Sequence, residues 1–159
     1  MGKILFVAFP FSIHTARWIN QLSNGGFEVH LYSSHRGAQP HDQLSKDVIW
    51  HSNPENLQRK RSFAERLYRK IKPAIAKAPA QELTDLIKTI QPDIVHSLES
   101  QHAGYLVSSA KENFSDNEFP FWMHSNWGID LHFFGRIKEH IPKLKKMLAG
   151  IDHLVTEGE

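Results

Sequence analysis

The opening of the chain alternates between apolar runs and an amphipathic segment, and this pattern constrains the fold more than any other feature. Residues 3–9 predict a first strand, because the six residues after Lys3 are all apolar, as in a strand that is covered on both faces. A helix is predicted over residues 13–22, because Ser12 is a good N-cap residue and Gly25 favours a helix end. Residues 27–32 predict a second strand. A strand, a helix and a strand within about 30 residues indicate a right-handed βαβ unit.

The same alternation continues to residue 156. Further strands are predicted over residues 47–51, 93–97, 119–124 and 152–156. Helices are predicted over residues 63–75, 79–90, 101–113 and 136–149, the last of them broken near Pro142. Strands that alternate with helices pair in parallel, with the helices packed on the sheet. The sequence therefore predicts an α/β fold, a doubly wound parallel sheet of about six strands with helices on both faces.

Length and composition narrow the class of protein. The chain has 159 residues, the size of one domain, and contains no cysteine. A disulfide scaffold, a thiol nucleophile and a cysteine metal site are therefore excluded. No apolar run reaches the roughly 18 residues that a membrane-spanning helix needs. We expect a single globular domain.

Basic residues are concentrated in one segment. The net charge is +2, but residues 59–77 hold eight basic residues and one acidic residue, a local charge of +7 against −5 for the rest of the chain. A basic helix with an apolar stripe is typical of contact with an anionic membrane surface, and a solvated helix face is the alternative. Aromatic residues are not interleaved with these charges, which argues against nucleic acid. The expected membrane-contact residues are Arg59, Lys60, Arg61, Arg66, Arg69, Lys70 and Lys72.

Ligands of doubly wound sheets bind outside the carboxyl ends of the strands, so the loops there hold the candidate site residues. After the first strand, a helix start offers backbone N–H groups to an anion, and His14 and Arg17 are further donors. After the fourth strand, Glu99 and His102 are candidate acids, bases or ligands of sugar hydroxyls. The alternatives are structural: exposed side chains in a first helical turn, and N-capping by Ser100.

The loop after the fifth strand is the most informative. Trp127 could supply a flat apolar platform for a sugar or a lipid, and Asp130 could orient a hydroxyl or act as a base. The structural alternative is a core tryptophan and an aspartate that caps a turn. The glycine-rich motifs of dinucleotide and P-loop sites, the nucleophile elbow and the H-E-x-x-H motif are all missing. The 11 histidines are scattered, so no metal site is expected.

Four segments together resemble the N-terminal domain of the GT-B glycosyltransferases, in particular the family-4 retaining enzymes. They are KILFVAFPFSIHTARWINQLSNGGFEVHLYSS, QPDIVHSLESQHAGYL, NWGIDL and IDHLVTE, and their order and spacing agree over essentially the whole chain. In that family two Rossmann-like domains face a cleft. The N-terminal domain mainly binds the acceptor, and the C-terminal domain binds the nucleotide-sugar donor.

The resemblance also implies roles for individual residues. Asp130 and Gly128 match a His-Gly-x-Asp pattern after the fifth strand, and we take Asp130 as the candidate catalytic residue. Trp127 stands where the family has its histidine, and His124 lies three residues earlier. The remaining candidate substrate-binding residues are His14, Arg17, Glu99, His102 and Trp127.

From the resemblance we expect residues 1–159 to be the N-terminal half of an enzyme whose donor-binding domain is absent from this chain. The reaction implied is transfer of a sugar from a nucleotide sugar to a glycan or lipid-linked acceptor with retention. Neither a cofactor nor an obligatory metal is implied, and the chain alone is expected to be inactive. The implied setting is cell-envelope polysaccharide synthesis on the cytoplasmic face of the membrane. The rival hypothesis is a stand-alone α/β domain that binds a nucleotide or another phosphorylated ligand.

Overall fold

One parallel sheet organises the molecule. The computed structural model describes residues 2–51 and 79–156. Its strands are β1 (Lys3–Ala8), β2 (Glu28–Ser33), β3 (Ile49–His51), β4 (Ile94–Leu98), β5 (Phe121–Asn126) and β6 (His153–Thr156). They are all parallel and lie in the order β3-β2-β1-β4-β5-β6. The order reverses between β1 and β4, so this is the doubly wound fold that the sequence predicts.

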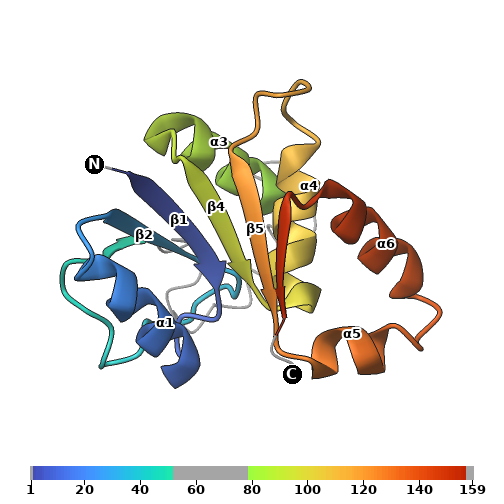
Figure 1. Ribbon diagram of the computed structural model, residues 1–159, viewed down its shortest axis with the longest axis horizontal. Coiled ribbons are helices and arrows are strands. Elements are labelled where there is room, and N and C mark those ends of the chain that lie inside the picture. The colour runs from blue at the N-terminus through green and yellow to red at the C-terminus, as the bar shows by residue number, and fades with distance from the viewer. Residues whose placement is uncertain (1, 52–78, 157–159) are drawn as a thin grey trace, which may run out of the picture.

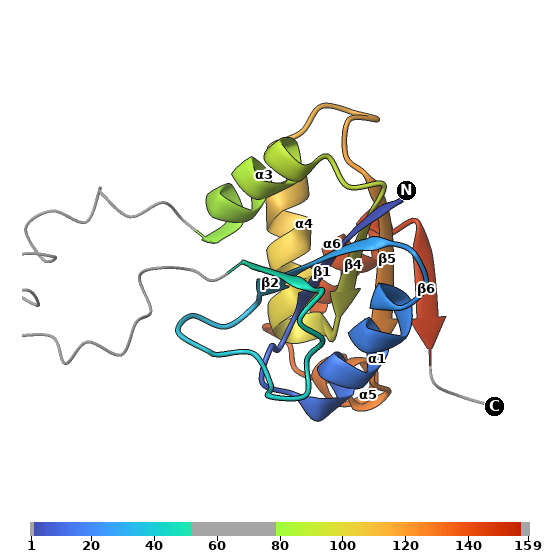
Figure 2. The ribbon, with the colours of Figure 1, turned by 90° about the vertical axis from the view of Figure 1, so that its left-hand side faces the viewer.

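Helices cover both faces of the sheet (Figures 1 and 2). They are α1 (Ile13–Ser23), α3 (Pro79–Ile90), the π-helical turn η2 (Ser100–Gly104), α4 (Tyr105–Lys111), α5 (Ile129–Phe134) and α6 (Ile141–Gly150). Figure 2 shows α3 and α4 on one side of the sheet and α1 on the other. The two sides follow from the right-handed crossovers, because the chain leaves β1 toward one edge and later returns past it toward the other.

Side chains alternate between the two faces of the sheet along each strand, and each face has its own hydrophobic core. On β1, Leu5 and Val7 face α3, α4 and α6, and they pack with the fully buried Trp122 of β5. Ile4 and Phe6 point to the opposite face, toward α1. Because successive strand residues point to opposite faces, a continuous apolar run is what a strand covered on both sides requires.

Most predicted elements are confirmed, and two helical predictions need correction. The helix predicted over residues 101–113 begins as the π-helical turn η2 and continues as α4. The helix predicted over residues 136–149 begins only at Ile141, and Pro142 lies in its first turn, where proline is tolerated. The short helix α5 was not predicted. The helix predicted over residues 63–75 lies outside the described residues.

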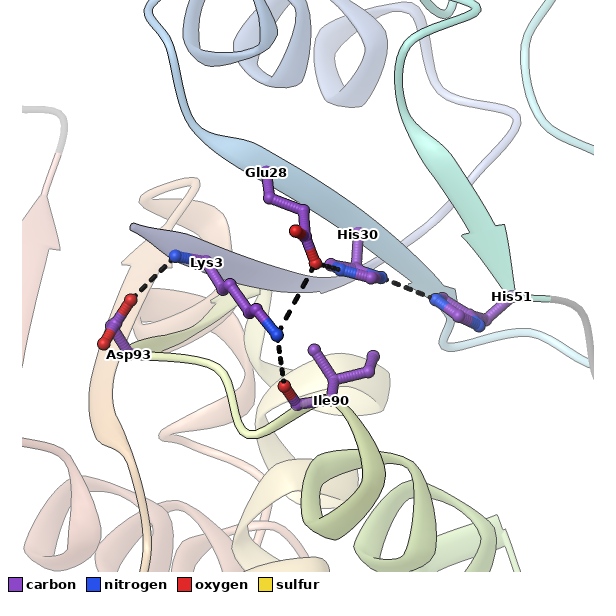
Figure 3. Close-up of polar contacts among 6 residues, drawn as sticks. All are labelled: Lys3, Glu28, His30, His51, Ile90 and Asp93. Atoms are coloured by element: carbon purple, nitrogen blue, oxygen red, sulfur yellow. Dashed lines mark hydrogen bonds and ion pairs between the residues drawn. The ribbon is translucent and has the colours of Figure 1, made fainter. Parts of the chain in front are cut away.

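A chain of polar contacts links β1, β2 and β3 on the side of the sheet that α3 covers (Figure 3). Lys3 Nζ lies 3.8 Å from Glu28 Oε1, which is 2.9 Å from His30 Nε2. His30 Nδ1 is in turn 2.8 Å from His51 Nε2, so the two imidazoles share one proton between these nitrogens. Burial and the neighbouring His30 lower the pKa of His51. The side chains of His30 and His51 therefore form hydrogen bonds between neighbouring strands of the sheet.

A second polar chain is buried under β4 and β5. The indole N–H of Trp122 donates to Ser97 Oγ at 2.9 Å, and Ser97 Oγ lies 2.8 Å from His124 Nδ1. His124 Nε2 reaches Ser100 Oγ at 3.2 Å. The neighbouring His96 bonds Ser125 Oγ at 2.8 Å. Burial lowers the pKa of His96 and of His124 to about 4, so both are neutral at pH 7.

These two histidines predict an acid-sensitive fold. Their pKa values are lowered in the folded state, so the unfolded chain binds more protons below about pH 6.5. Their stabilising contribution is therefore complete above that pH and is lost as the pH falls toward 4. We expect His124→Gln to reduce the pH dependence of the free energy of unfolding between pH 6.5 and 4 by about 3 kcal/mol.

Guanidinium chloride unfolding at several pH values measures this dependence. Met123→Leu, a substitution in the same strand that removes no titratable group, should keep the full pH dependence. An unchanged dependence in His124→Gln would contradict the assignment of His124 as a buried neutral imidazole.

Candidate functional site

A pocket of about 470 Å³ lies where the strand order reverses. It is lined by residues that follow three strands, among them Phe9 after β1, Glu99 after β4 and Trp127 after β5. In Figure 1 this is the edge of the sheet toward which the arrowheads of these strands point, with the start of α1 and α5 nearby. The carboxyl edge at the reversal point is the usual ligand site of doubly wound sheets.

Glu99 shapes the floor of this pocket through its backbone. Its φ of 75° and ψ of 152° fall in a region that glycine occupies readily and other residues seldom do. Its N–H donates to the carbonyl of Ser125 at 3.0 Å, and its carbonyl accepts the N–H of Gly104 at 3.0 Å. The carboxylate accepts the N–H of His102 at 3.0 Å and also that of Ala103. These contacts hold the strained backbone and cap η2.

The carboxyl group of Glu99 has a raised pKa. Burial, together with the nearby charge of Asp130, raises the pKa of Glu99 to about 7, although the backbone N–H groups oppose the shift. Glu99 is only 3% exposed. The site therefore contains a carboxyl group that changes its charge near neutral pH.

Asp130 is fixed by a contact across the pocket floor. It lies in the first turn of α5 and is 5% exposed, and its Oδ2 accepts the N–H of Ser100 at 3.0 Å. Gly128 precedes this turn with a φ of 74°, a conformation that favours glycine. The N–H of Gly128 donates to Asn126 Oδ1 at 2.9 Å, which closes the turn from β5 into α5.

Aromatic rings line the walls. The Trp127 ring lies 5.5 Å from that of His14, and the Phe9 ring lies 5.3 Å from that of His102, measured between centroids. On the far side, the Phe134 ring lies 4.8 Å from the His140 ring. Such walls suit the flat apolar face of a sugar ring.

The structure brings most of the predicted site residues together. The pocket is lined by His14, Glu99, His102, Trp127 and Asp130. Arg17 is exposed on α1 and does not line the pocket, and Gly128 contributes its backbone conformation instead. The seven predicted membrane-contact residues lie outside the described residues.

His124 takes no place in the pocket. It is fully buried beneath the floor, where it bonds Ser97 and Ser100. It therefore supports η2 from below and does not substitute for the histidine of the family pattern.

Sequence reasoning missed one wall. Tyr105, Phe134, His140 and Lys143 line the pocket from α4, α5 and the start of α6. No sequence signal placed His140 and Lys143 there, because they reach the pocket only through the return of the chain from α5 to α6. Tyr105 could have been identified as a residue near the carboxyl edge, because it lies at the start of α4, soon after the end of β4.

Two features were sought among the described residues, a metal-binding cluster and a membrane-spanning helix. They contain no group of three or more His, Asp or Glu side chains arranged to hold a metal ion. None of their helices is long and apolar enough to cross a membrane.

Comparison with known protein families gives a match over most of the chain. A sequence model of the family described as "Glycosyl transferase 4-like" matches residues 3–157 of the chain. No curated protein matches the sequence.

The raised pKa of Glu99 predicts a local titration. Protonation of the carboxylate weakens its hydrogen bonds with two backbone N–H groups, so the amide resonances of His102 and Ala103 should move with a midpoint near pH 7. A pH series of ¹⁵N-resolved NMR spectra measures this. Glu99→Gln should abolish the titration at both amides. If both amides titrate identically in Glu99→Gln, another group is responsible and the assignment is wrong.

Proposed function

The chain belongs to the glycosyl transferase 4-like family, and from this premise we propose that it is the acceptor-binding N-terminal domain of a retaining glycosyltransferase. Family membership places the chain in glycosyl transfer.

The observation that carries the proposal is that Trp127 and Asp130 both line the pocket at the point of strand reversal. An indole ring offers an apolar face to a sugar, and a fixed carboxylate in the same pocket can bind hydroxyl groups. Asp130 holds the N–H of Ser100 with Oδ2, which leaves Oδ1 to accept a hydrogen bond from the acceptor. In this role Asp130 orients the attacking hydroxyl.

The donor would approach from the opposite side of a cleft. We assign the nucleotide sugar mainly to a second domain, with His14 and the start of α1 as the contribution of this chain. The reaction needs no cofactor in this scheme. Catalysis comes from the positioning of the two substrates and from electrostatic stabilisation of the departing diphosphate.

The basic segment at residues 59–77 supports a location beside a membrane. Each Lys or Arg near an anionic lipid surface contributes about 1 kcal/mol to binding. We assign the protein to the cytoplasmic face of a membrane, where it would act on a glycan or lipid-linked acceptor in cell-envelope polysaccharide synthesis. Arg17 does not line the pocket, so we assign it no contact with the acceptor.

The role of Asp130 predicts a loss of turnover. In the protein that carries both domains, Asp130→Asn should lower kcat about 100-fold, because the substitution removes the negative charge of the carboxylate that orients the attacking hydroxyl. Transfer from a labelled nucleotide sugar measures kcat. Asp42→Asn, which removes an exposed carboxylate that does not line the pocket, is the matched control and should retain full activity.

The domain assignment has its own test. The coding sequence that follows residue 159 should specify a second βαβ-rich domain, the donor-binding domain that the resemblance implies, and residues 1–159 alone should transfer no sugar. A stop codon at that point would favour the rival α/β binding domain. Transfer by the purified 159-residue chain would overturn the assignment.

The membrane assignment predicts charge-dependent sedimentation with liposomes. The protein should co-sediment with vesicles that contain anionic lipid, and reversal of the seven charges between Arg59 and Lys72 should abolish the binding. If the charge-reversed protein binds equally well, the membrane assignment is wrong and the basic segment is only a solvated surface.

A further inference from the structure

Glu99 has two features that lower the stability of the fold. Its φ of 75° is a conformation that few residues other than glycine adopt. Burial raises the pKa of its carboxyl group to about 7, so the folded chain holds this proton more tightly than the unfolded chain does. The free energy of unfolding therefore falls as the pH rises toward 7 and the buried carboxyl group ionises. Residues that keep such unfavourable features are concentrated at functional sites.

The carboxylate of Glu99 is bonded to the turn η2. Both of its oxygens accept the N–H of His102, at 3.0 and 3.1 Å, and one of them also accepts the N–H of Ala103. An ionised carboxylate accepts hydrogen bonds from backbone N–H groups more strongly than a neutral carboxyl group does. Protonation of Glu99 therefore weakens the contacts that hold η2.

The same turn also holds Asp130. The N–H of Ser100, the first residue of η2, donates to Asp130 Oδ2 at 3.0 Å. The side chain of Gln101 donates from Nε2 to the carbonyl oxygen of Asp130 at 3.2 Å. Because Ser100 directly follows Glu99, η2 is a short covalent link between the buried carboxylate and Asp130. A shift of η2 moves the donors that fix Asp130.

The surroundings of Glu99 do not neutralise its charge. Among the residues that the structure describes, Glu99 has no cationic partner, and the charge of Asp130 on α5 opposes its ionisation. Burial lowers the pKa of His102 and of His124, so both titrate at a lower pH than Glu99. The titratable groups around the pocket floor are His14 on α1, His102 on η2, Tyr105 on α4, Asp130 on α5, and His140 and Lys143 at α6, with His124 of β5 beneath them.

We propose that Glu99 is a positioning residue, whose ionised carboxylate orients Asp130 through η2 and makes turnover depend on the protonation state of Glu99. The inference rests on the proposed function, because it deepens the role of Asp130 in orienting the acceptor hydroxyl. When Glu99 is ionised, η2 is held firmly and the Ser100 N–H fixes Asp130. When Glu99 is protonated, η2 loosens and Asp130 is less well oriented. The protein is therefore more active above pH 7 than below it.

The pH dependence of kcat tests this role in the protein that carries both domains. With a labelled nucleotide sugar and saturating acceptor, kcat of the unsubstituted protein should fall about fivefold from pH 8 to pH 6. Glu99→Gln keeps the shape of the side chain and removes its charge. It should lower kcat about tenfold at pH 8, abolish the pH dependence between pH 8 and 6, and change the KM for the acceptor less than twofold.

Glu118→Gln is the matched control. Glu118 is exposed, its Oε2 accepts the backbone N–H of Ser115 at 3.1 Å, and it does not line the pocket. This variant should keep both kcat and its pH dependence. Glu99→Gln removes a buried charge, so its thermal unfolding temperature at pH 8 should be no lower than that of the unsubstituted protein. A lowered kcat in Glu99→Gln is then not a consequence of unfolding.

NMR spectra of the unsubstituted chain test the link through η2 without any variant. The amide resonance of Ser100 and the side-chain carboxyl carbon of Asp130 should both shift with a midpoint near pH 7, because they follow the protonation of Glu99. If neither signal moves between pH 6 and 8, the link is wrong. The positioning role is also overturned if kcat of the unsubstituted protein is constant from pH 8 to pH 6, or if Glu99→Gln keeps the same pH dependence.

The outcomes separate this inference from the proposed function. If Asp130→Asn lowers kcat while Glu99→Gln leaves kcat and its pH dependence unchanged, the proposed role of Asp130 stands and the positioning role of Glu99 falls. If the Ser100 amide follows Glu99 but Asp130→Asn keeps full activity, the link through η2 stands and the proposed role of Asp130 falls.

Discussion

The reversal of strand order between β1 and β4 is the constraint on which the rest of the structure depends. β1 and β4 are hydrogen-bonded neighbours, yet the chain leaves β1 toward one edge of the sheet and leaves β4 toward the other. The loops after these two strands therefore diverge and leave a hollow between them. Glu99 and Phe9 line this hollow because they directly follow the two strands. The place of the site is thus a consequence of topology.

A buried network connects the hydrophobic core to this hollow. The chain of hydrogen bonds from Trp122 through Ser97 and His124 ends at Ser100, whose backbone N–H binds Asp130. Every member is nearly or fully buried, so each lost contact would leave an unpaired polar group. The turn η2 packs closely against β5 because Gly104 has no side chain, and a Cβ there would lie 3.3 Å from the ring of His124. The position of Asp130 is therefore set by packing well below the pocket.

The sequence predicted what depends on local pattern and missed what depends on tertiary contact. The apolar run of β1 and the glycines after α1 specify the first βαβ unit, and the predicted helix over residues 79–90 matches α3. The helix α5 has only six residues and follows a glycine, so neither periodicity nor a capping side chain marks it. The positive φ of Glu99 could not be predicted, because it is imposed by hydrogen bonds from separate elements. The sequence also did not predict that His140 and Lys143 line the pocket, because the packing of α6 in the folded chain brings them there.

The central claim is that an acceptor sugar binds against Trp127 in the pocket at the strand reversal. The most direct measurement follows the indole N–H resonances of the four tryptophans in ¹⁵N-labelled protein during titration with a panel of methyl glycosides and sugar phosphates. The account predicts a saturable shift of the Trp127 indole resonance, with the resonance of Trp122 unchanged because its indole is buried and bonded to Ser97. Saturable binding that leaves the Trp127 resonance unmoved, or that shifts only the other tryptophans, would contradict it.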